Sequence, residues 1–213
     1  KDHWQSLGWS LEQMQAEWNA YISGAKGKNN DYTGQGLLSR LNAFELMMAP
    51  YIISHLRMGL LLQEDKELPF DFDSSDRLNV FLTNALEHPY DRGSLFSSQL
   101  KDMFADETNN ADVVKKDTAI TVVLGNPPYS GESTNNEREI TRLMKDYKKE
   151  PGGIEQLKER NPKWINDDYV KFMRSAQDYL KRSYLGVFGY INPHGFLDNP
   201  TFRGVRWHLW TGY

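Results

Sequence analysis

The chain has 213 residues, of which 39% are hydrophobic and 25% are charged, which is enough for one α/β domain with its own core. The formal net charge of −4 gives no overall basic field for nucleic acid, so basic contacts must be locally clustered or lie in another domain. The absence of cysteine excludes disulfides and thiolate metal sites. With no transmembrane stretch and no signal-peptide pattern, we expect a cytoplasmic protein without a membrane partner.

The first part of the chain predicts helices and strands in alternation. Apolar residues at helical spacing predict a helix over residues 11–21, and a polar Gly-Lys-Asn loop follows over 23–31. Residues 41–46 predict a strand. A helix then begins at Pro50 and runs to about residue 62, because proline suits a first helical position. Alternating apolar residues over 78–82 predict the next strand.

The second part continues this order. Residues 94–116 are mostly polar, with short helical stretches, and the β-branched run 121–124 predicts a buried parallel strand. Residues 132–163 are charged and contain a Pro-Gly-Gly breaker, so we expect a partly mobile insertion. Asn166 or Asp167 then caps a helix with one apolar face as far as Leu180, and residues 187–191 predict a last strand. This βαβ order predicts a parallel, doubly wound sheet.

The most informative segment is Asn126-Pro127-Pro128-Tyr129, which follows the predicted central strand and Gly125. Two consecutive prolines cannot continue a sheet ladder, so the chain leaves the sheet as a stiff loop at the strand's carboxyl edge. There Asn126 offers an amide, Pro127 offers a backbone carbonyl, and Tyr129 adds an aromatic face. Two acceptors and a flat ring suit the exocyclic amine of a nucleobase. The structural alternative is a proline-stiffened turn with a capping Asn.

At these residues the chain resembles S-adenosylmethionine-dependent amino methyltransferases, above all DNA adenine-N6 methyltransferases, which carry an Asn-Pro-Pro-Tyr motif. Segments 129–133, 157–172 and 197–204 resemble the methyltransferase region of type ISP restriction-modification enzymes, which join a nuclease, a translocase, a methyltransferase and a target-recognition domain in one polypeptide. The likeness covers most of residues 36–206. It implies that residues 1–213 are a fragment of one methyltransferase catalytic domain, with a partial Rossmann-like fold.

The resemblance also implies cofactor-binding residues. Glu45 ends a predicted strand, where an acid commonly binds ribose hydroxyls, so we expect it to bind the ribose of S-adenosylmethionine. Asn84 follows the next strand, at the point where many relatives bind the cofactor's adenine amine. The alternatives are a glutamate favoured by a helix dipole and an ordinary turn Asn.

One expected part of the site is missing from the sequence. No first strand with a Gly-rich turn lies between Lys1 and Phe44, and the resemblance places this turn upstream. We therefore expect an isolated fragment that is inactive, within an intact enzyme whose partners are double-stranded DNA and its own other domains. Two alternatives stay open: a methyltransferase for protein glutamine or guanine amines, and a non-catalytic docking module.

Other polar residues carry less weight. The basic residues between 145 and 163 are interleaved with Tyr147 and Trp164 and could contact phosphates, but their acidic neighbours favour a solvated surface. His55 is interpreted as a helix-face residue, and His194 either lines the site or lies in an ordinary loop. No cluster has the spacing of metal ligands.

Overall fold

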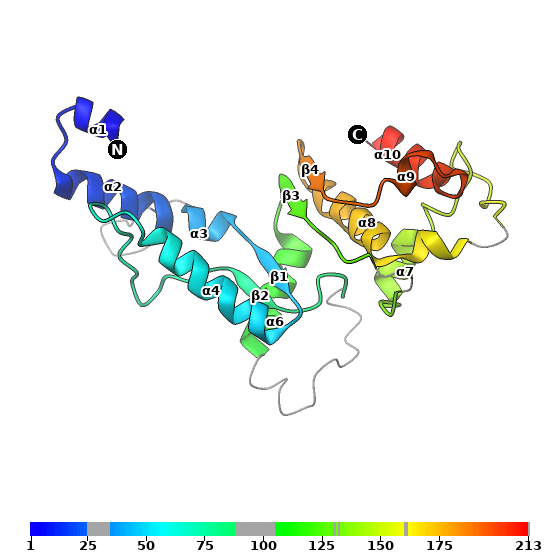
Figure 1. The fold of residues 1–213 in the computed structure, drawn as a ribbon, viewed down its shortest axis with the longest axis horizontal. Coiled ribbons are helices and arrows are strands. Elements are labelled where there is room, and N and C mark those ends of the chain that lie inside the picture. Colours follow the sequence, from blue (N-terminus) through cyan, green and yellow to red (C-terminus); the bar gives the residue numbers. More distant parts are fainter. Residues whose placement is uncertain (25–34, 88–104, 130, 132, 160–161, 213) are drawn as a thin grey trace. The chain divides into compact units, whose positions relative to one another are not determined.

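The computed structural model divides the chain into two compact units, each described here by itself (Figure 1). The first unit comprises residues 1–84 and 105–111, and the second comprises the remainder from residue 85 onward. The predicted loop 23–31 and the polar stretch 94–104 lie almost entirely outside the described residues. The residues that the structure describes are 1–24, 35–87, 105–129, 131, 133–159 and 162–212.

The first unit contains two parallel strands and several helices, with a core of buried residues from both halves of the unit. β1 pairs with β2 in parallel, with Ala43 opposite Val80 and Glu45 opposite Leu82. The core cluster joins Ile22 on the second helix to Phe70 in the connection before β2. The elements are α1 (Asp2–Ser6), α2 (Leu11–Ser23), α3 (Leu37–Arg40), β1 (Ala43–Glu45), α4 (Met48–Leu62), β2 (Val80–Leu82) and the first part of α6 (Ala105–Asp117).

Helix boundaries in this unit follow local capping. α2 begins after Ser10, whose hydroxyl accepts from the Gln13 N–H while the Gln13 side chain accepts from the Ser10 N–H, which forms a capping box. α4 begins at Met48, two residues before the predicted start at Pro50. The proline is tolerated there because the first-turn N–H groups have no partner within a helix.

The predicted strand over residues 78–82 is confirmed as β2, and all three residues of this strand are buried. Val80, Phe81 and Leu82 are each 2% exposed. α4 packs against this strand, and His55 on α4 contacts the Val80 carbonyl oxygen through Nε2 at 3.2 Å. Burial of every residue is the usual pattern of a parallel strand that is covered on both faces.

The second unit places two further parallel strands beside a long amphipathic helix. β3 pairs with β4, with Val122 opposite Val187 and Gly125 opposite Tyr190. α8 contacts both strands. The elements are the end of α6, β3 (Val122–Gly125), α7 (Arg138–Met144), η1 (Pro162–Asn166), α8 (Asp168–Leu180), β4 (Val187–Tyr190), α9 (Gly195–Asp198), η2 (Pro200–Phe202) and α10 (Arg203–Gly212).

The central strand is not buried as predicted. Phe188 and Tyr190 of β4 pack against the main core cluster, so this face of the sheet is covered. Val122 and Leu124 point to the opposite face and are 52% and 75% exposed. A continuous apolar run predicts a strand that is buried on both faces of its sheet. Among the described residues, only the face that carries Phe188 and Tyr190 is covered.

The predicted α/β class with parallel strands is confirmed. Within the described ranges they form two sheets of two strands each. None of the described helices is long and apolar enough to cross a membrane.

The charged segment predicted as an insertion contributes to the core of the second unit. Ile140, Leu143 and Met144 on α7 are buried, and Tyr147 is fully buried. A charged hairpin follows, in which Lys149 pairs with Gln156 in an antiparallel bridge, and Arg203 joins this hairpin to α10.

Arg203 binds the two carboxylate oxygens of Glu150 at 2.7 Å each and a third oxygen on Glu159. These hydrogen bonds lower the pKa of Glu150 to about 2. Gly204 allows the close approach, because a Cβ at this position would meet the Lys149 carbonyl oxygen at 2.1 Å. One guanidinium thus joins α10 to the charged hairpin.

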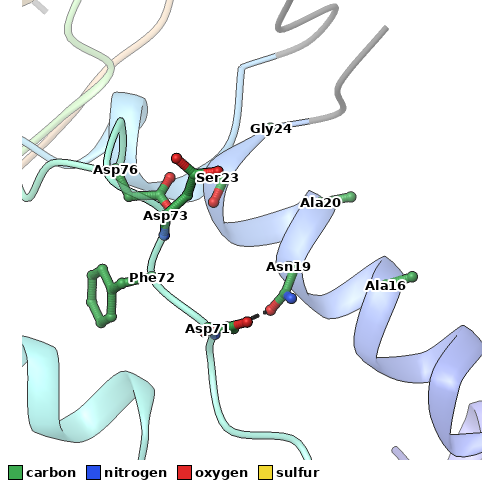
Figure 2. Close-up of a pocket in the computed structure, with 9 residues that line it drawn as sticks. All are labelled: Ala16, Asn19, Ala20, Ser23, Gly24, Asp71, Phe72, Asp73 and Asp76. Atoms are coloured by element: carbon green, nitrogen blue, oxygen red, sulfur yellow. Dashed lines mark hydrogen bonds between the residues drawn. The ribbon is translucent and has the colours of Figure 1, made fainter. Parts of the chain in front are cut away.

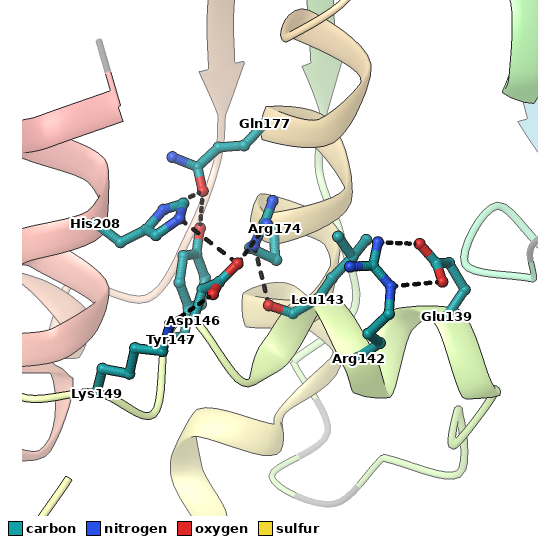
Figure 3. Close-up of polar contacts among 9 residues, drawn as sticks. All are labelled: Glu139, Arg142, Leu143, Asp146, Tyr147, Lys149, Arg174, Gln177 and His208. Atoms are coloured by element: carbon teal, nitrogen blue, oxygen red, sulfur yellow. Dashed lines mark hydrogen bonds and ion pairs between the residues drawn. The ribbon is translucent and has the colours of Figure 1, made fainter. Parts of the chain in front are cut away.

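A polar network connects α7, α8 and α10 (Figure 3). Asp146, just after α7, accepts from Arg174 Nη2 at 3.0 Å and from Lys149 Nζ at 3.1 Å. Burial raises the pKa of Asp146, but these hydrogen bonds outweigh burial and the pKa is lowered. On α8, the Gln177 Oε1 accepts from the Tyr147 hydroxyl at 2.7 Å and lies 3.1 Å from His208 Nδ1. The network therefore fixes the packing of three helices.

Stability should depend on the protonation of His208. Burial, and then the nearby Arg174, lower the pKa of His208 below its ordinary value of 6.5, although Asp146 opposes this. The unfolded chain then binds more protons than the folded chain below pH 6.5. The contribution of His208 to the free energy of unfolding should be constant above pH 6.5. It should fall as the pH drops from 6.5 through the lowered pKa of His208 in the folded chain. Denaturant unfolding between about pH 5 and 8 measures this.

His208→Gln should flatten the pH dependence of the free energy of unfolding in this window. Parallel curves for the wild type and His208→Gln would contradict the expectation.

Candidate active site

The predicted catalytic loop begins where β3 ends, at the carboxyl edge of the second unit's sheet. Asn126 and Pro128 are exposed, Pro127 between them is buried, and Tyr129 is 51% exposed. The loop thus exposes an amide and an aromatic ring, while a buried proline fixes the backbone between them.

Both ends of this loop are anchored. At its start, Ile191 N–H donates to the Gly125 carbonyl oxygen at 3.1 Å and extends the pairing of β3 with β4. At its end, Gly131 N–H donates to Asp167 Oδ2 at 2.9 Å. Asp167 was predicted as a possible helix cap, and it does precede α8, but its carboxylate makes no cap hydrogen bond and holds the loop instead. The sequence carries no local signal for this contact, which joins residues 36 positions apart.

Asn126 and Tyr129 form a direct contact. The Tyr129 hydroxyl donates to Asn126 Oδ1 at 2.8 Å. The oxygen that was predicted to accept from a substrate amine therefore has a donor of its own, supplied by the ring predicted to stack on the base. Because both side chains are exposed, water can replace this hydrogen bond at small cost.

Two further acceptors lie at the same sheet edge. Among the described residues, no N–H donates to the Pro127 carbonyl oxygen. Asn192 follows β4, and its Oδ1 is buried with no hydrogen-bond partner in the part of the chain described here. A buried acceptor without a donor is costly, so Asn192 is suited to a donor from a bound molecule. The sequence signal for it is an Asn-Pro pair directly after a strand, as at Asn126.

The predicted cofactor-binding residues lie together in the first unit. Glu45 ends β1 and Asn84 follows β2, at the carboxyl ends of paired parallel strands, and the Thr83 N–H donates to the Glu45 carbonyl oxygen at 2.9 Å. Glu45 Oε1 accepts from the Met47 N–H at 2.8 Å, and Met47 caps α4. Asn84 is 7% exposed. The Met47 contact is what the alternative interpretation of Glu45, a glutamate at a helix N-terminus, would produce, and Glu45 Oε2 has no partner among the described residues.

A cavity of about 510 Å³ in the first unit lies elsewhere (Figure 2). It contains Asp71, Asp73 and Asp76, but Asp76 Oδ2 accepts from the Asp73 N–H at 2.8 Å and Asp73 Oδ1 accepts from the Ser75 N–H at 3.0 Å. These carboxylates stabilise their own turn. Within the described ranges, no three acidic, histidine or cysteine side chains converge as a metal site.

The remaining candidate histidines take different places. His55 contacts the backbone of β2 and packs edge-on against Tyr51, with 4.6 Å between ring centroids, as a helix-face residue would. His194 is exposed and caps α9, close in sequence to the end of β4.

An α/β fold with parallel strands, in which the Asn-Pro-Pro-Tyr loop follows the carboxyl end of one strand, is consistent with a methyltransferase fold. The chain belongs to the Eco57I restriction-modification methylase family, whose profile matches residues 42–211. A methylase of this family requires a methyl donor. No curated protein matches the chain significantly.

Solved structures show the same fold. The chain resembles the ATP-dependent Type ISP restriction-modification enzyme LlaBIII bound to DNA, at 18% identity and a TM-score of 0.59 over 96% of this chain and 12% of that one. It resembles a nuclease-deletion mutant of the Type ISP enzyme LlaGI with a DNA substrate mimic, at 18% identity and a TM-score of 0.62 over 100% and 17%. It also resembles the DrdV–DNA complex, at 23% identity and a TM-score of 0.55, over 78% of this chain and 15% of that one.

The predicted resemblance to restriction-modification methyltransferases is therefore confirmed. The chain spans between 12% and 17% of the length of these three proteins.

Gly125→Ala should destabilise the second unit, because a Cβ at this position would lie 2.8 Å from Tyr190 Cε1. Overpacking of this kind costs about 1–3 kcal/mol, and we expect such a loss in the free energy of unfolding by denaturant titration. The matched control is Gly195→Ala in the same unit, where an added Cβ meets nothing within 4 Å, and the change should stay within about 0.5 kcal/mol. Equal effects of the two variants would show that the Tyr190 contact is not a constraint.

Proposed function

We propose that this chain is part of a site-specific DNA methyltransferase that transfers a methyl group from S-adenosylmethionine to the N6 amine of a flipped adenine. The enzyme would act within a cytoplasmic restriction-modification system. The observation that supports this best is the loop after β3, where the exposed Asn126 amide, the Pro127 carbonyl and the half-exposed Tyr129 ring lie within four residues. The DNA-bound state of the similar structures is further support for DNA as the partner.

The acceptor pair meets the main chemical difficulty of the reaction. The lone pair of adenine N6 is delocalised into the ring, so the amine is planar and a poor nucleophile. Asn126 Oδ1 and the Pro127 carbonyl oxygen would accept its two hydrogens, favour pyramidal geometry and stabilise the positive charge that develops on nitrogen. Both acceptors are fixed by the anchored loop, so little reorganisation is needed during the reaction.

The Tyr129–Asn126 hydrogen bond adds an exchange step to this proposal. Asn126 Oδ1 accepts from the Tyr129 hydroxyl in the structure, so an arriving N6–H group would replace this donor. The ring of Tyr129 would then stack on the flipped base. Because one donor replaces another on the same oxygen, the net cost of the exchange is small.

Glu45 fits part of the methyl donor. Its Oε2, which has no partner among the described residues, lies at the carboxyl end of a parallel strand and suits the ribose hydroxyls. Asn84 would accept the adenine amine through its side-chain carbonyl oxygen. S-adenosylmethionine supplies an electrophilic methyl group on a sulfonium. Since residues 1–44 contain no strand with a Gly-rich turn, other segments would bind its methionine portion.

Asn126→Ala in the full-length enzyme should abolish methylation, because it removes the side-chain acceptor of the amine. Asn126→Asp, which retains an acceptor oxygen, should keep part of the activity. The measurement is transfer of labelled methyl groups to duplex DNA, with N6-methyladenine identified after digestion and with protein as a parallel substrate. Activity of Asn126→Ala within a few-fold of the wild type would refute the assignment.

Substitutions of Tyr129 separate its ring from its hydroxyl. Tyr129→Phe should remain within a few-fold of wild-type kcat/KM, because the stacking face is kept and only the exchangeable donor is lost. Tyr129→Ala should lose about 1–3 kcal/mol of stacking, which is about 5- to 150-fold in kcat/KM. If Tyr129→Phe were as impaired as Tyr129→Ala, the hydroxyl rather than the ring would be required, and the stacking role would be wrong.

A further inference from the structure

A pocket lined by lysine, hydroxyl and amide groups lies directly beyond the Asn-Pro-Pro-Tyr loop. Its volume is about 440 Å³, and its described lining contains no carboxylate. Gly131, two residues after Tyr129, contributes to the lining, so the pocket adjoins the base-holding loop within the same unit. The polar residues that line it are Ser133, Asn136, Thr141, Lys148, Lys163, Asn166 and Lys171.

Lys171 forms the rigid floor of this pocket. Its side chain, on α8, is 3% exposed. The ammonium group donates to Ser133 Oγ at 2.8 Å, to the Asn135 carbonyl oxygen and to Asn136 Oδ1 at 3.4 Å. Asp168 Oδ1 accepts from Ser133 Oγ and from Asn135 Nδ2, which fixes the same loop from the other side. The pocket is therefore built from packed groups rather than from loose surface side chains.

Lys148 is the group without a countercharge. It is half-buried, and among the described residues its ammonium has no hydrogen bond or ion pair. Burial lowers its pKa. Burial also lowers the pKa of Lys171, where Asp168 opposes the shift and Lys148 adds to it. Two cations in one cavity thus repel each other, and a bound anion would offset this repulsion.

The rim of the pocket suits a nucleic-acid strand. Lys163 is exposed, with its ammonium 5.1 Å from the ring centroid of Trp164, and Trp164 is 48% exposed. Positive charge graded from a buried floor to an exposed rim, beside an aromatic ring, is the surface that a phosphate backbone requires.

We infer that this pocket binds a phosphate group, and specifically a backbone phosphate of the DNA strand next to the flipped base. The shared chemistry is a tetrahedral anion that accepts from Lys148, from Lys163 and from the hydroxyl and amide groups of the lining. DNA as the source of the phosphate rests on the proposed function, because the pocket adjoins the loop that would hold the base. The other source of the same chemistry is free phosphate.

The test compares Lys148→Gln with Lys145→Gln in the full-length enzyme. Lys145 is exposed, lies three residues away and does not line the pocket, so it carries the same charge change without the site. Binding of a duplex oligonucleotide is measured between about 50 and 300 mM salt. Lys148→Gln should weaken binding several-fold and reduce the slope of log K against log salt by about one, whereas Lys145→Gln should leave both unchanged. Lys163→Gln should act in the same direction as Lys148→Gln.

An unchanged slope for Lys148→Gln, or equal losses in Lys148→Gln and Lys145→Gln, would overturn the DNA assignment. Inorganic phosphate distinguishes the other source. If it raises the melting temperature of the wild type but not of Lys148→Gln, while the DNA slope is unchanged, the pocket is a free-phosphate site.

Methylation by Asn126→Ala is measured in the same preparations. If Asn126→Ala retains methylation while Lys148→Gln reduces the slope of log K against log salt, the proposed chemistry is refuted but the phosphate pocket is supported. Lys171 is not substituted, because its loss would disrupt the loop that it supports.

Discussion

Two hydrogen bonds fix the ends of the loop between Gly125 and Gly131: one from the Ile191 N–H to the Gly125 carbonyl oxygen, and one from the Gly131 N–H to the Asp167 carboxylate. Between these anchors the prolines have no N–H, so the loop cannot satisfy its own carbonyls by folding into a helix or a hairpin. Both acceptors therefore remain at the sheet edge, as the proposed function requires. The pairing of β4 with β3 and the position of the α8 N-terminus are what make both anchors possible.

A site of this kind must keep polar groups available without leaving them unsatisfied. Asn126 is exposed and its Oδ1 accepts from the Tyr129 hydroxyl, so this oxygen can exchange one donor for another at low cost. Asn192 Oδ1 lies after the neighbouring strand, and it is buried without a hydrogen-bond donor among the described residues. A buried acceptor without a donor costs free energy, and a ligand that donates to it recovers this cost as binding free energy. Asn192 Oδ1 therefore favours binding of a hydrogen-bond donor at the edge of β3 and β4.

The local parts of this site could be predicted from the sequence, and the long-range parts could not. The strand before Gly125 and its end at the proline pair were predicted from local signals, as was the position of Glu45 at the end of a strand, whereas the exposure of the strand before Gly125 was not. The packing of Ile140 and Tyr147 was missed because these apolar residues are diluted among charges and lack a clear period. The contacts of Lys171 with residues more than 30 positions away have no sequence signature, and exposure of Leu124 depends on which neighbours cover the sheet.

The distribution of basic residues explains why a net charge of −4 does not argue against nucleic acid. In the second unit arginines act as clamps: Arg203 holds Glu150 and Glu159, and Arg174 holds Asp146. A planar guanidinium suits such fixed, multidentate geometry, but a cation paired in this way adds little field at the surface. Lys148 is compact, flexible and unpaired among the described residues, so its charge remains effective. The electrostatic character of this surface therefore depends on cations such as Lys148, which lines the pocket beside the proposed base-holding loop.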